Sequence, residues 1–105
     1  MTKMRLWHGE VAIAKADEYE KLMIEKAVAY YSSVDGLLSL SFQRRNENTK
    51  AHFLLVTIWD SLDSIKQFAG PEPELARYYP EDDHFLLEKE KYTSIYDVFF
   101  QKEFN

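Results

Sequence analysis

Histidine is the side chain best suited to proton transfer and metal binding near neutral pH, and this chain has three. His8 and Glu10 are two residues apart in a segment of alternating polarity, so they share one face of a strand. An imidazole and a carboxylate on one face can bind a metal ion. A strand with one solvated end produces the same pattern, and we favour that interpretation, so no metal site is predicted. His52 begins a strand beside a polar loop and is expected to be exposed.

His84 follows the acidic run Glu81-Asp82-Asp83. A histidine that faces a pocket can act as a general base, and His84 is our candidate for that role. The same run is typical of a solvated acidic turn, which is the more common outcome. The two interpretations differ in whether the imidazole faces a pocket.

The run Arg77-Tyr78-Tyr79 combines a cation with two aromatic rings. An arginine beside a phenolate can stabilise its charge, so Arg77 is a candidate catalytic residue. The two tyrosines follow breaks at Pro71 and Pro73, and we expect them to form part of a lid. A surface ion pair of Arg77 with a neighbouring glutamate is the alternative and is more common.

Periodicity predicts four strands, over residues 4–13, 37–45, 51–60 and 93–101. A first helix should begin at a capping box of Asp17 and Glu20 and end at Gly36. A second helix should begin at Ser61 and end at Gly70, with a further helical piece opened by Pro73. The order βαββαβ predicts an α+β ferredoxin-like domain, with an antiparallel four-stranded sheet and helices on one face.

The strand over residues 51–60 is apolar on both faces, so both faces should be buried. Helices of the same chain can cover one face only, because 105 residues form a single domain with one core, about residues 5–100. We therefore expect a homodimer that pairs its sheet faces. The aromatic residues near the C-terminus, Phe99, Phe100 and Phe104, are expected to contribute dimer contacts.

Composition excludes several classes of protein. The net charge is −5 and the basic residues are scattered, which argues against nucleic-acid partners and against anionic membranes. There is no cysteine, so disulfides and cysteine-based metal sites are excluded. No segment approaches the roughly 20 apolar residues of a membrane-spanning helix. The N-terminal residues lack an apolar signal core, and a cytoplasmic protein is expected.

One strand runs into Trp59-Asp60-Ser61 and directly into a helix, and Gly36-Leu37-Leu38 precedes the second strand. This arrangement resembles the antibiotic biosynthesis monooxygenase family of dimeric α/β barrels. The resemblance covers roughly residues 5–100. It implies a pocket between sheet and helices, a flat aromatic substrate and a reaction with oxygen that needs no metal or flavin. It also implies that substrate is bound by residues near the junction and the lid: Trp59, Leu55, Phe68, Tyr78 and Tyr79. A Trp59 that only staples the second helix to the sheet is the favoured alternative.

Three positions depart from the family's pattern. Leu55, Gln43 and Ile65 stand where the resembling oxygenases carry an asparagine, a histidine and a tyrosine. The resemblance therefore implies a cofactor-independent monooxygenase for a hydroquinone-like or anthrone-like substrate, and the departures favour a non-catalytic binding or structural dimer as the alternative.

The haem-degrading branch of the family ranks lower. It needs an axial histidine late in the second helix, where this chain has Tyr78 or Tyr79. It also needs a tryptophan near Phe68 and an asparagine near His8 or Gly9. Only a displaced ligand such as His84 could hold the iron.

Overall fold

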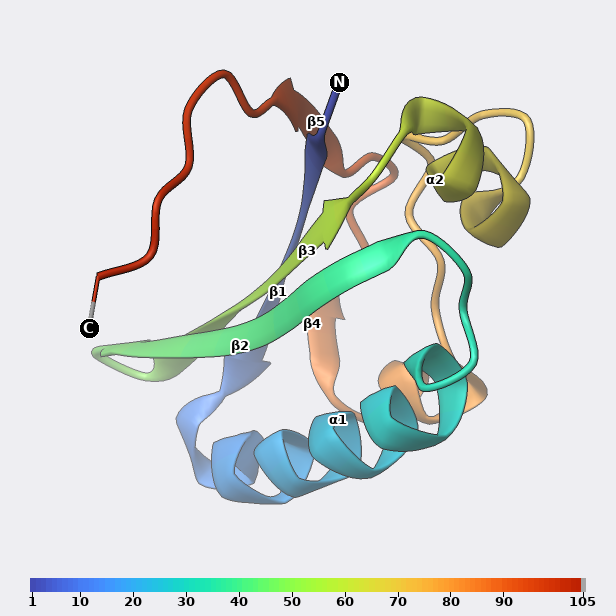
Figure 1. The fold of residues 1–105 in the computed structure, drawn as a ribbon. Helices are drawn as coiled ribbons and strands as arrows, with labels where there is room; N and C mark the ends of the chain where they lie inside the picture. Colours follow the sequence, from blue (N-terminus) through green and yellow to red (C-terminus); the bar gives the residue numbers. More distant parts are fainter. Residues whose placement is uncertain (105) are drawn as a thin grey trace.

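The computed structural model describes residues 1–104, and two helices lie on one side of an antiparallel sheet (Figure 1). The elements follow in the order β1 (Lys3–Ala12), η1 (Ile13–Lys15), α1 (Ala16–Tyr31), β2 (Leu37–Glu47), β3 (Lys50–Trp59), α2 (Leu62–Ala69), η2 (Pro80–His84), β4 (Leu86–Glu88) and β5 (Ser94–Asp97). The sheet order is β2-β3-β1-β4, with β5 also beside β1. The predicted ferredoxin-like α+β fold is confirmed.

Two short strands occupy the edge of the sheet beside β1, where a single strand over residues 93–101 is predicted, and the first of them, β4, was not predicted. β4 pairs with Glu10 and Val11 of β1, and β5 pairs with the opposite end of β1, from Lys3 to Leu6. Residues 89–93 leave the edge of β1 between these two pairings and meet the preceding loop instead, where Leu75 bridges Tyr92. The expected strand over residues 93–101 is therefore wrong in extent, since only Ser94–Asp97 is regular.

The helical piece expected after Pro73 is also wrong, because residues 71–79 contain no helix. One turn bond lies within the segment, from the Leu75 amide to the Glu72 carbonyl, and other backbone groups bond outside it: the amide of Ala76 donates to the carbonyl of Lys91 at 2.9 Å, and the carbonyl of Glu74 accepts from Thr93. The segment is therefore an extended loop that runs along residues 91–93.

The ends of the helices show which capping predictions hold. Ser61 caps α2, since its hydroxyl accepts from the amide of Ser64 at 3.1 Å. The capping box of Asp17 and Glu20 is wrong: α1 starts one residue earlier, with no side-chain cap. Both carboxylates instead bind Arg44 of β2, at 2.7 and 2.8 Å.

The helix-facing side of the sheet holds the core. Alternate residues of β1 and β3 are buried there, and Tyr19 and Ala16 of α1 pack on them. The opposite side, which we call the outer face, carries apolar side chains that the chain's own helices do not cover. These are half-exposed residues of β1 and β3: Met4, Leu6, Leu54, Val56 and Ile58.

Gly36 does not end the first helix as predicted, because α1 ends at Tyr31. It has a φ of +83° and lies against the start of α2, and its carbonyl accepts from the amide of Asp60 at 2.9 Å. A Cβ atom at this position would lie 2.2 Å from the Ser64 hydroxyl oxygen. The glycine therefore lets the chain enter β2 while touching the β3–α2 junction.

No helix among the described residues combines the length and the apolar character that crossing a membrane requires.

We predict that Gly36→Ala destabilises the protein more than Gly70→Ala. Both glycines have positive φ, +83° and +98°, so either alanine is strained, by about 1–3 kcal/mol. A Cβ at Gly70 meets nothing within 4 Å, whereas one at Gly36 also collides with Ser64, which adds about 1–3 kcal/mol. Denaturant unfolding of both variants measures the difference, and equal losses would contradict the close approach at Gly36.

Candidate functional site

A pocket lies between the helix-facing side of the sheet, α1, α2 and the loop that leads to η2. It is partly open to solvent and has a volume of about 130 Å³. Its walls come from β1 to β3 (Arg5, Trp7, Phe42 and Leu55), from α1 (Tyr19, Leu22, Met23, Lys26, Ala27, Tyr30 and Tyr31) and from the later segments (Phe68, Arg77, Tyr78, Tyr79 and Asp82).

Aromatic rings from three elements form one wall of the pocket. Tyr31 packs on Phe68 with ring centroids 4.9 Å apart, and Tyr30 meets Phe68 and Tyr79 edge to face at 5.5 and 5.8 Å. Burial raises the pKa of Tyr79 to about 12 and also raises that of Tyr31. These hydroxyls therefore stay neutral and can donate hydrogen bonds at physiological pH.

Arg5 is a buried cation on the floor of the pocket, with only 4% of its surface exposed. Its Nε donates to the Pro73 carbonyl at 3.1 Å and its Nη2 to the Leu75 carbonyl at 2.9 Å. Among the described residues no carboxylate forms an ion pair with it. Burial lowers its pKa, but an arginine remains charged. The charge of Arg5 is therefore uncompensated.

Arg77 adds a second positive charge at the same end of the pocket. Its Nη1 donates to the carbonyl of Phe68. The guanidinium carbons of Arg77 and Arg5 lie 5.6 and 5.9 Å from the centroid of the Phe68 ring. Two guanidiniums beside one aromatic ring, without a carboxylate between them, favour an anionic ligand.

Asp82 is the buried acid of the pocket, with 3% of its surface exposed. It accepts from the Tyr19 hydroxyl at 2.9 Å and from the Tyr79 amide at 2.7 Å. Burial raises the pKa of Asp82, and burial with this neighbouring carboxylate raises that of Tyr19. A carboxylate with a raised pKa is a better proton acceptor, so the pair can take a proton from a bound hydroxyl.

The indole of Trp7 offers a free donor. Its Nε1 is buried and makes no hydrogen bond to the described residues. It lies near enough to the Tyr78 hydroxyl to oppose the rise in the pKa of Tyr78 that burial causes. A buried N–H without a partner costs free energy unless a ligand or water accepts from it, so this atom marks a place for a polar ligand atom.

The structure brings five of the seven predicted site residues to this pocket: Leu55, Phe68, Arg77, Tyr78 and Tyr79. Trp59 does not line it. That side chain is fully buried, its Nε1 donates to the Thr57 hydroxyl at 2.8 Å, and its ring packs on Phe68 at 5.4 Å. Trp59 thus fixes the second helix to the sheet, which is the alternative to substrate binding that the sequence favoured.

His84 also lies outside the pocket. It is exposed on the neighbouring groove with Lys15 and Glu18. The amine of Lys15 donates to its backbone carbonyl at 3.0 Å. Asp82, two residues earlier, is the titratable group of this segment that turns inward.

Sequence reasoning missed the main polar groups, Arg5, Trp7, Tyr19 and Asp82. One signal was present: alternation places Arg5 and Trp7 on the same strand face as Val11, and an arginine on an apolar face needs an explanation. Asp82 carried no such signal, because the acids on both sides of it give the sequence the pattern of a solvated turn, in which all three carboxylates would be exposed.

No family model matches the chain, and no curated protein matches it. Solved structures do. One is a putative antibiotic biosynthesis monooxygenase from Bacillus cereus, with 13% identity, 97% of each chain covered and a TM-score of 0.69. Another is a heme-degrading protein from Mycobacterium tuberculosis, with 19% identity, 98% of this chain and 100% of that chain covered and a TM-score of 0.65. A conserved protein from Methanosarcina mazei Go1 has 17% identity, 91% coverage of both chains and a TM-score of 0.66. The chain shares their fold over nearly its whole length.

The raised pKa of Asp82 predicts a characteristic pH dependence of stability. A carboxyl with a higher pKa in the folded than in the unfolded state makes the free energy of unfolding fall as pH rises above the ordinary value of 3.8, until the folded pKa is passed. Asp82→Asn should therefore gain stability relative to wild type over that rise. Urea unfolding from pH 3 to pH 7 measures the difference.

Glu81→Gln is the matched control, because a hydrogen bond from Lys26 lowers the pKa of Glu81. Glu81 stabilises the fold above its ordinary pKa, and this contribution is lost as pH falls through its folded pKa. As pH rises, the free energy of unfolding of Asp82→Asn should therefore increase relative to wild type, and that of Glu81→Gln should decrease. The two changes should fall in different pH windows. A flat Asp82→Asn difference would show that the carboxyl is not perturbed.

Proposed function

We propose that this chain is a small oxygenase that binds a single-ring phenol or hydroquinone as its anion and oxidises it with O₂ without metal or flavin. The observation that carries the proposal is Arg5, a buried guanidinium without a carboxylate partner among the described residues. Leaving a buried charge uncompensated is costly. A ligand that brings a negative charge to the pocket removes that cost.

The volume of the pocket narrows the substrate class. A closed apolar cavity of about 150 Å³ accommodates benzene, and this pocket has about 130 Å³ with an open mouth. A single ring fits inside. An anthrone has three fused rings, and the outer rings would extend through the mouth, so a hydroquinone is the better candidate of the two substrate types.

The polar groups have separate roles in this proposal. Arg5 and Arg77 hold the ionised oxygen of the hydroquinone anion, and the N–H of Trp7 donates to an oxygen substituent of the ring. The second hydroxyl of the substrate donates to Tyr19, whose own hydroxyl already points at Asp82. Asp82 accepts the proton through Tyr19, and the tyrosines and Phe68 hold the ring flat.

The substrate itself supplies the electrons. An ionised phenol is electron-rich enough to pass an electron to O₂, and the two radicals combine to a hydroperoxide at an unsubstituted ring carbon, para to the oxygen in a phenol and ortho to it in a hydroquinone. The O–O bond then breaks and water leaves. One phenol and one O₂ give one p-quinone and one water, and one hydroquinone and one O₂ give one hydroxy-p-quinone and one water. In both reactions four electrons leave the ring, one oxygen atom stays on carbon and the other leaves as water.

Haem is a poor fit to the same pocket, although a heme-degrading protein shares the fold. A porphyrin is several times larger than the ring that about 130 Å³ accommodates, and none of the lining residues is a histidine. His84, the displaced ligand considered from the sequence, lies on another groove. The pocket therefore does not suit the haem-degrading alternative.

A non-catalytic binder with the same pocket is the second candidate. Leu55 gives the wall no polar atom where the resembling oxygenases have an amide. Ile65 is fully buried, and Gln43 extends from the outer face. The polar groups that the resembling oxygenases have at these positions are thus absent from this pocket. Binding without turnover is the outcome that would favour this candidate.

We also propose that two copies pair through their outer faces into a shared barrel. The half-exposed apolar residues of β1 and β3 form a continuous surface there. Beyond β5 the chain continues to residue 104 without a further strand (Figure 1), and Phe99, Phe100 and Phe104 are 94, 76 and 83% exposed. A second copy would bury both groups.

Oxygen uptake by chelator-treated protein with a panel of hydroquinones and anthrones tests the reaction. We expect uptake above the rate without protein, greatest with single-ring substrates, and lowered about tenfold or more by Arg77→Gln and by Asp82→Asn, because a lost charge-assisted contact costs about 1.5–3 kcal/mol. Lys66→Gln, an exposed cation on α2 away from the pocket, is the matched control.

Ligand-dependent quenching of tryptophan fluorescence, measured on the same samples, separates binding from turnover. Saturable binding that Arg77→Gln weakens, with uptake equal to the rate without protein, would assign the pocket to a binder. Neither binding nor uptake would contradict the proposal as a whole.

Sedimentation equilibrium at micromolar concentration tests the dimer. The chain has a mass of 12.4 kDa, and we expect a species of twice that mass. Val56→Glu places a charge in the centre of the outer face and should shift the equilibrium to the monomer. Val28→Glu, at a 66% exposed position of α1, should not. A wild-type protein found only at 12.4 kDa would refute the pairing.

A further inference from the structure

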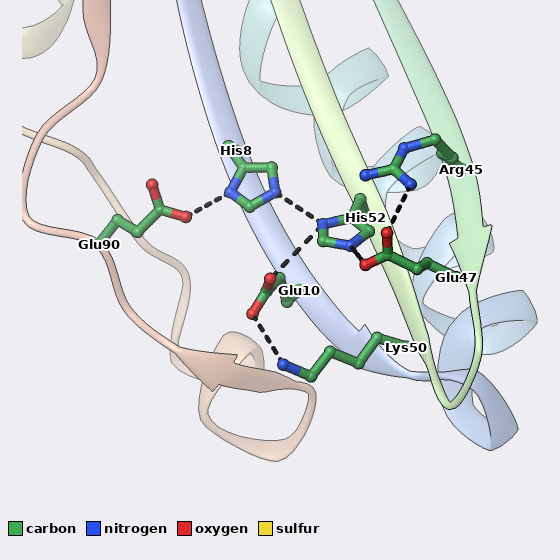
Figure 2. Close-up of polar contacts among 7 residues, drawn as sticks. All are labelled: His8, Glu10, Arg45, Glu47, Lys50, His52 and Glu90. Carbon is green, nitrogen blue, oxygen red and sulfur yellow. Dashed lines mark hydrogen bonds and ion pairs between the residues drawn. The ribbon is translucent and has the colours of Figure 1, made fainter.

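A second cluster of chemically capable side chains lies on the outer face, away from the pocket. Figure 2 shows His8 and Glu10 of β1 beside His52 of β3. Glu10 and His52 are direct partners in the antiparallel register, and His8 is two residues along the same face of β1. Their donor atoms all lie within 4.8 Å of one another.

Two of the three separations between these atoms match those of a coordination shell. His8 Nε2 lies 3.1 Å from His52 Nδ1, and Glu10 Oε1 lies 3.5 Å from the same Nδ1. Ligands about 2.0–2.1 Å from a tetrahedral zinc ion are roughly 3.3 Å apart. A separation of 3.5 Å is long for a hydrogen bond to an imidazole, but it suits two atoms that share an ion.

Hydrogen bonds on the far side of each ring set the tautomers. His8 Nδ1 contacts the Glu90 carboxylate, and His52 Nε2 lies 3.1 Å from Glu47 Oε1 (Figure 2). A carboxylate accepts, so the ring protons belong on these two nitrogens. The lone pairs of His8 Nε2 and His52 Nδ1 then point at each other. Two facing lone pairs repel unless a proton or a cation lies between them.

Carboxylates behind metal-bound histidines are the usual second layer of a metal site, because they orient the rings and raise their basicity. Here both histidines have one, Glu90 and Glu47. The two nearby cations contact other atoms: Lys50 lies 3.7 Å from Glu10 Oε2, and Arg45 binds Glu47 Oε2 at 3.0 Å. Glu10 Oε1 remains free to bind a metal ion.

The charge of the cluster also suits a cation. Three carboxylates (Glu10, Glu47 and Glu90) against two cations (Arg45 and Lys50) leave one net negative charge when both histidines are neutral. The side chains of His8, Glu10 and His52 are 31, 24 and 14% exposed. In the single chain an ion can therefore reach them from solvent and keep a water molecule as its fourth ligand, and pairing of two copies through their outer faces would enclose the bound ion.

We propose that His8, Glu10 and His52 bind a divalent transition-metal ion of the zinc type, with Glu90 and Glu47 orienting the two imidazoles. Two nitrogen donors and one oxygen donor suit Zn²⁺ and Co²⁺ rather than Mg²⁺ or Ca²⁺. The ion links β1 to β3. It lies on the opposite side of the sheet from the aromatic pocket, so the site is independent of the oxygenase proposal.

Calorimetric titration of the untagged, chelator-treated chain with Zn²⁺ tests the site. We expect about one ion per chain, and Co²⁺ in place of Zn²⁺ should give the visible absorption of tetrahedral coordination. X-ray absorption of the zinc-loaded wild type should show two imidazole ligands and one carboxylate. Failure of Zn²⁺ to bind at about 100 µM, or a spectrum without imidazole, would overturn the proposal.

Variants identify the ligands. His52→Ala and His8→Ala should weaken zinc binding by about 100-fold or more, and Glu90→Gln by about 10–100-fold through the orientation of His8. His84→Ala is the matched control, because it removes an exposed histidine outside the cluster, and its affinity should equal that of wild type. Equal affinities of His52→Ala and His84→Ala would overturn the assignment. Circular dichroism confirms folding, and the wild-type absorption spectrum decides the matter if an alanine variant does not fold.

Discussion

The pairing of β1 with β3 is the constraint on which the rest of the structure depends. Ten consecutive residue pairs run from Lys3 opposite Trp59 to Ala12 opposite Lys50. Side chains alternate between faces, so a slip of one residue would move every side chain of one strand to the wrong side. This register places Arg5 and Trp7 in the pocket, and it places His8 and Glu10 on the outer face. Both candidate sites therefore depend on the same ten pairs.

The irregular segments after α2 follow from the burial of Arg5. A guanidinium on the core side of the sheet needs acceptors that the interior of a helix cannot offer, because carbonyls there bond within the helix. The loop over residues 71–79 stays extended, and its carbonyls at Pro73 and Leu75 face Arg5. Residues 91–93 bond to the same loop, and this interrupts the fourth strand. The interruption brings Glu90 to both sites, since its carboxylate contacts His8 and its carbonyl accepts from Tyr78.

Local signals predicted the parts of the fold that local forces determine. The order of helices and strands, the Ser61 cap and the breaks at Gly70 and Pro71 all follow from near neighbours in the chain. The failures involve long-range partners. Asp17 looked like a helix cap, but Arg44 lies 27 residues away and binds its carboxylate. Likewise, no neighbour of His52 indicates that it faces Glu10 across the sheet.

The pocket lies between sheet and helices, as the resemblance to the oxygenases implies, but its polar groups come from other positions than in those enzymes. Leu55 and Ile65 are apolar where the resembling oxygenases have polar side chains, and polarity comes instead from Arg5, Trp7 and Asp82. Arg5 and Asp82 carry opposite charges, yet they do not pair: Arg5 donates to loop carbonyls and Asp82 accepts from Tyr19 and the Tyr79 amide. Because they do not neutralise each other, one end of the pocket stays positive and the other can accept a proton. Such a separation of charge suits the anion of a hydroquinone, whose ionised oxygen can lie beside the guanidiniums while its second hydroxyl faces Tyr19 and Asp82.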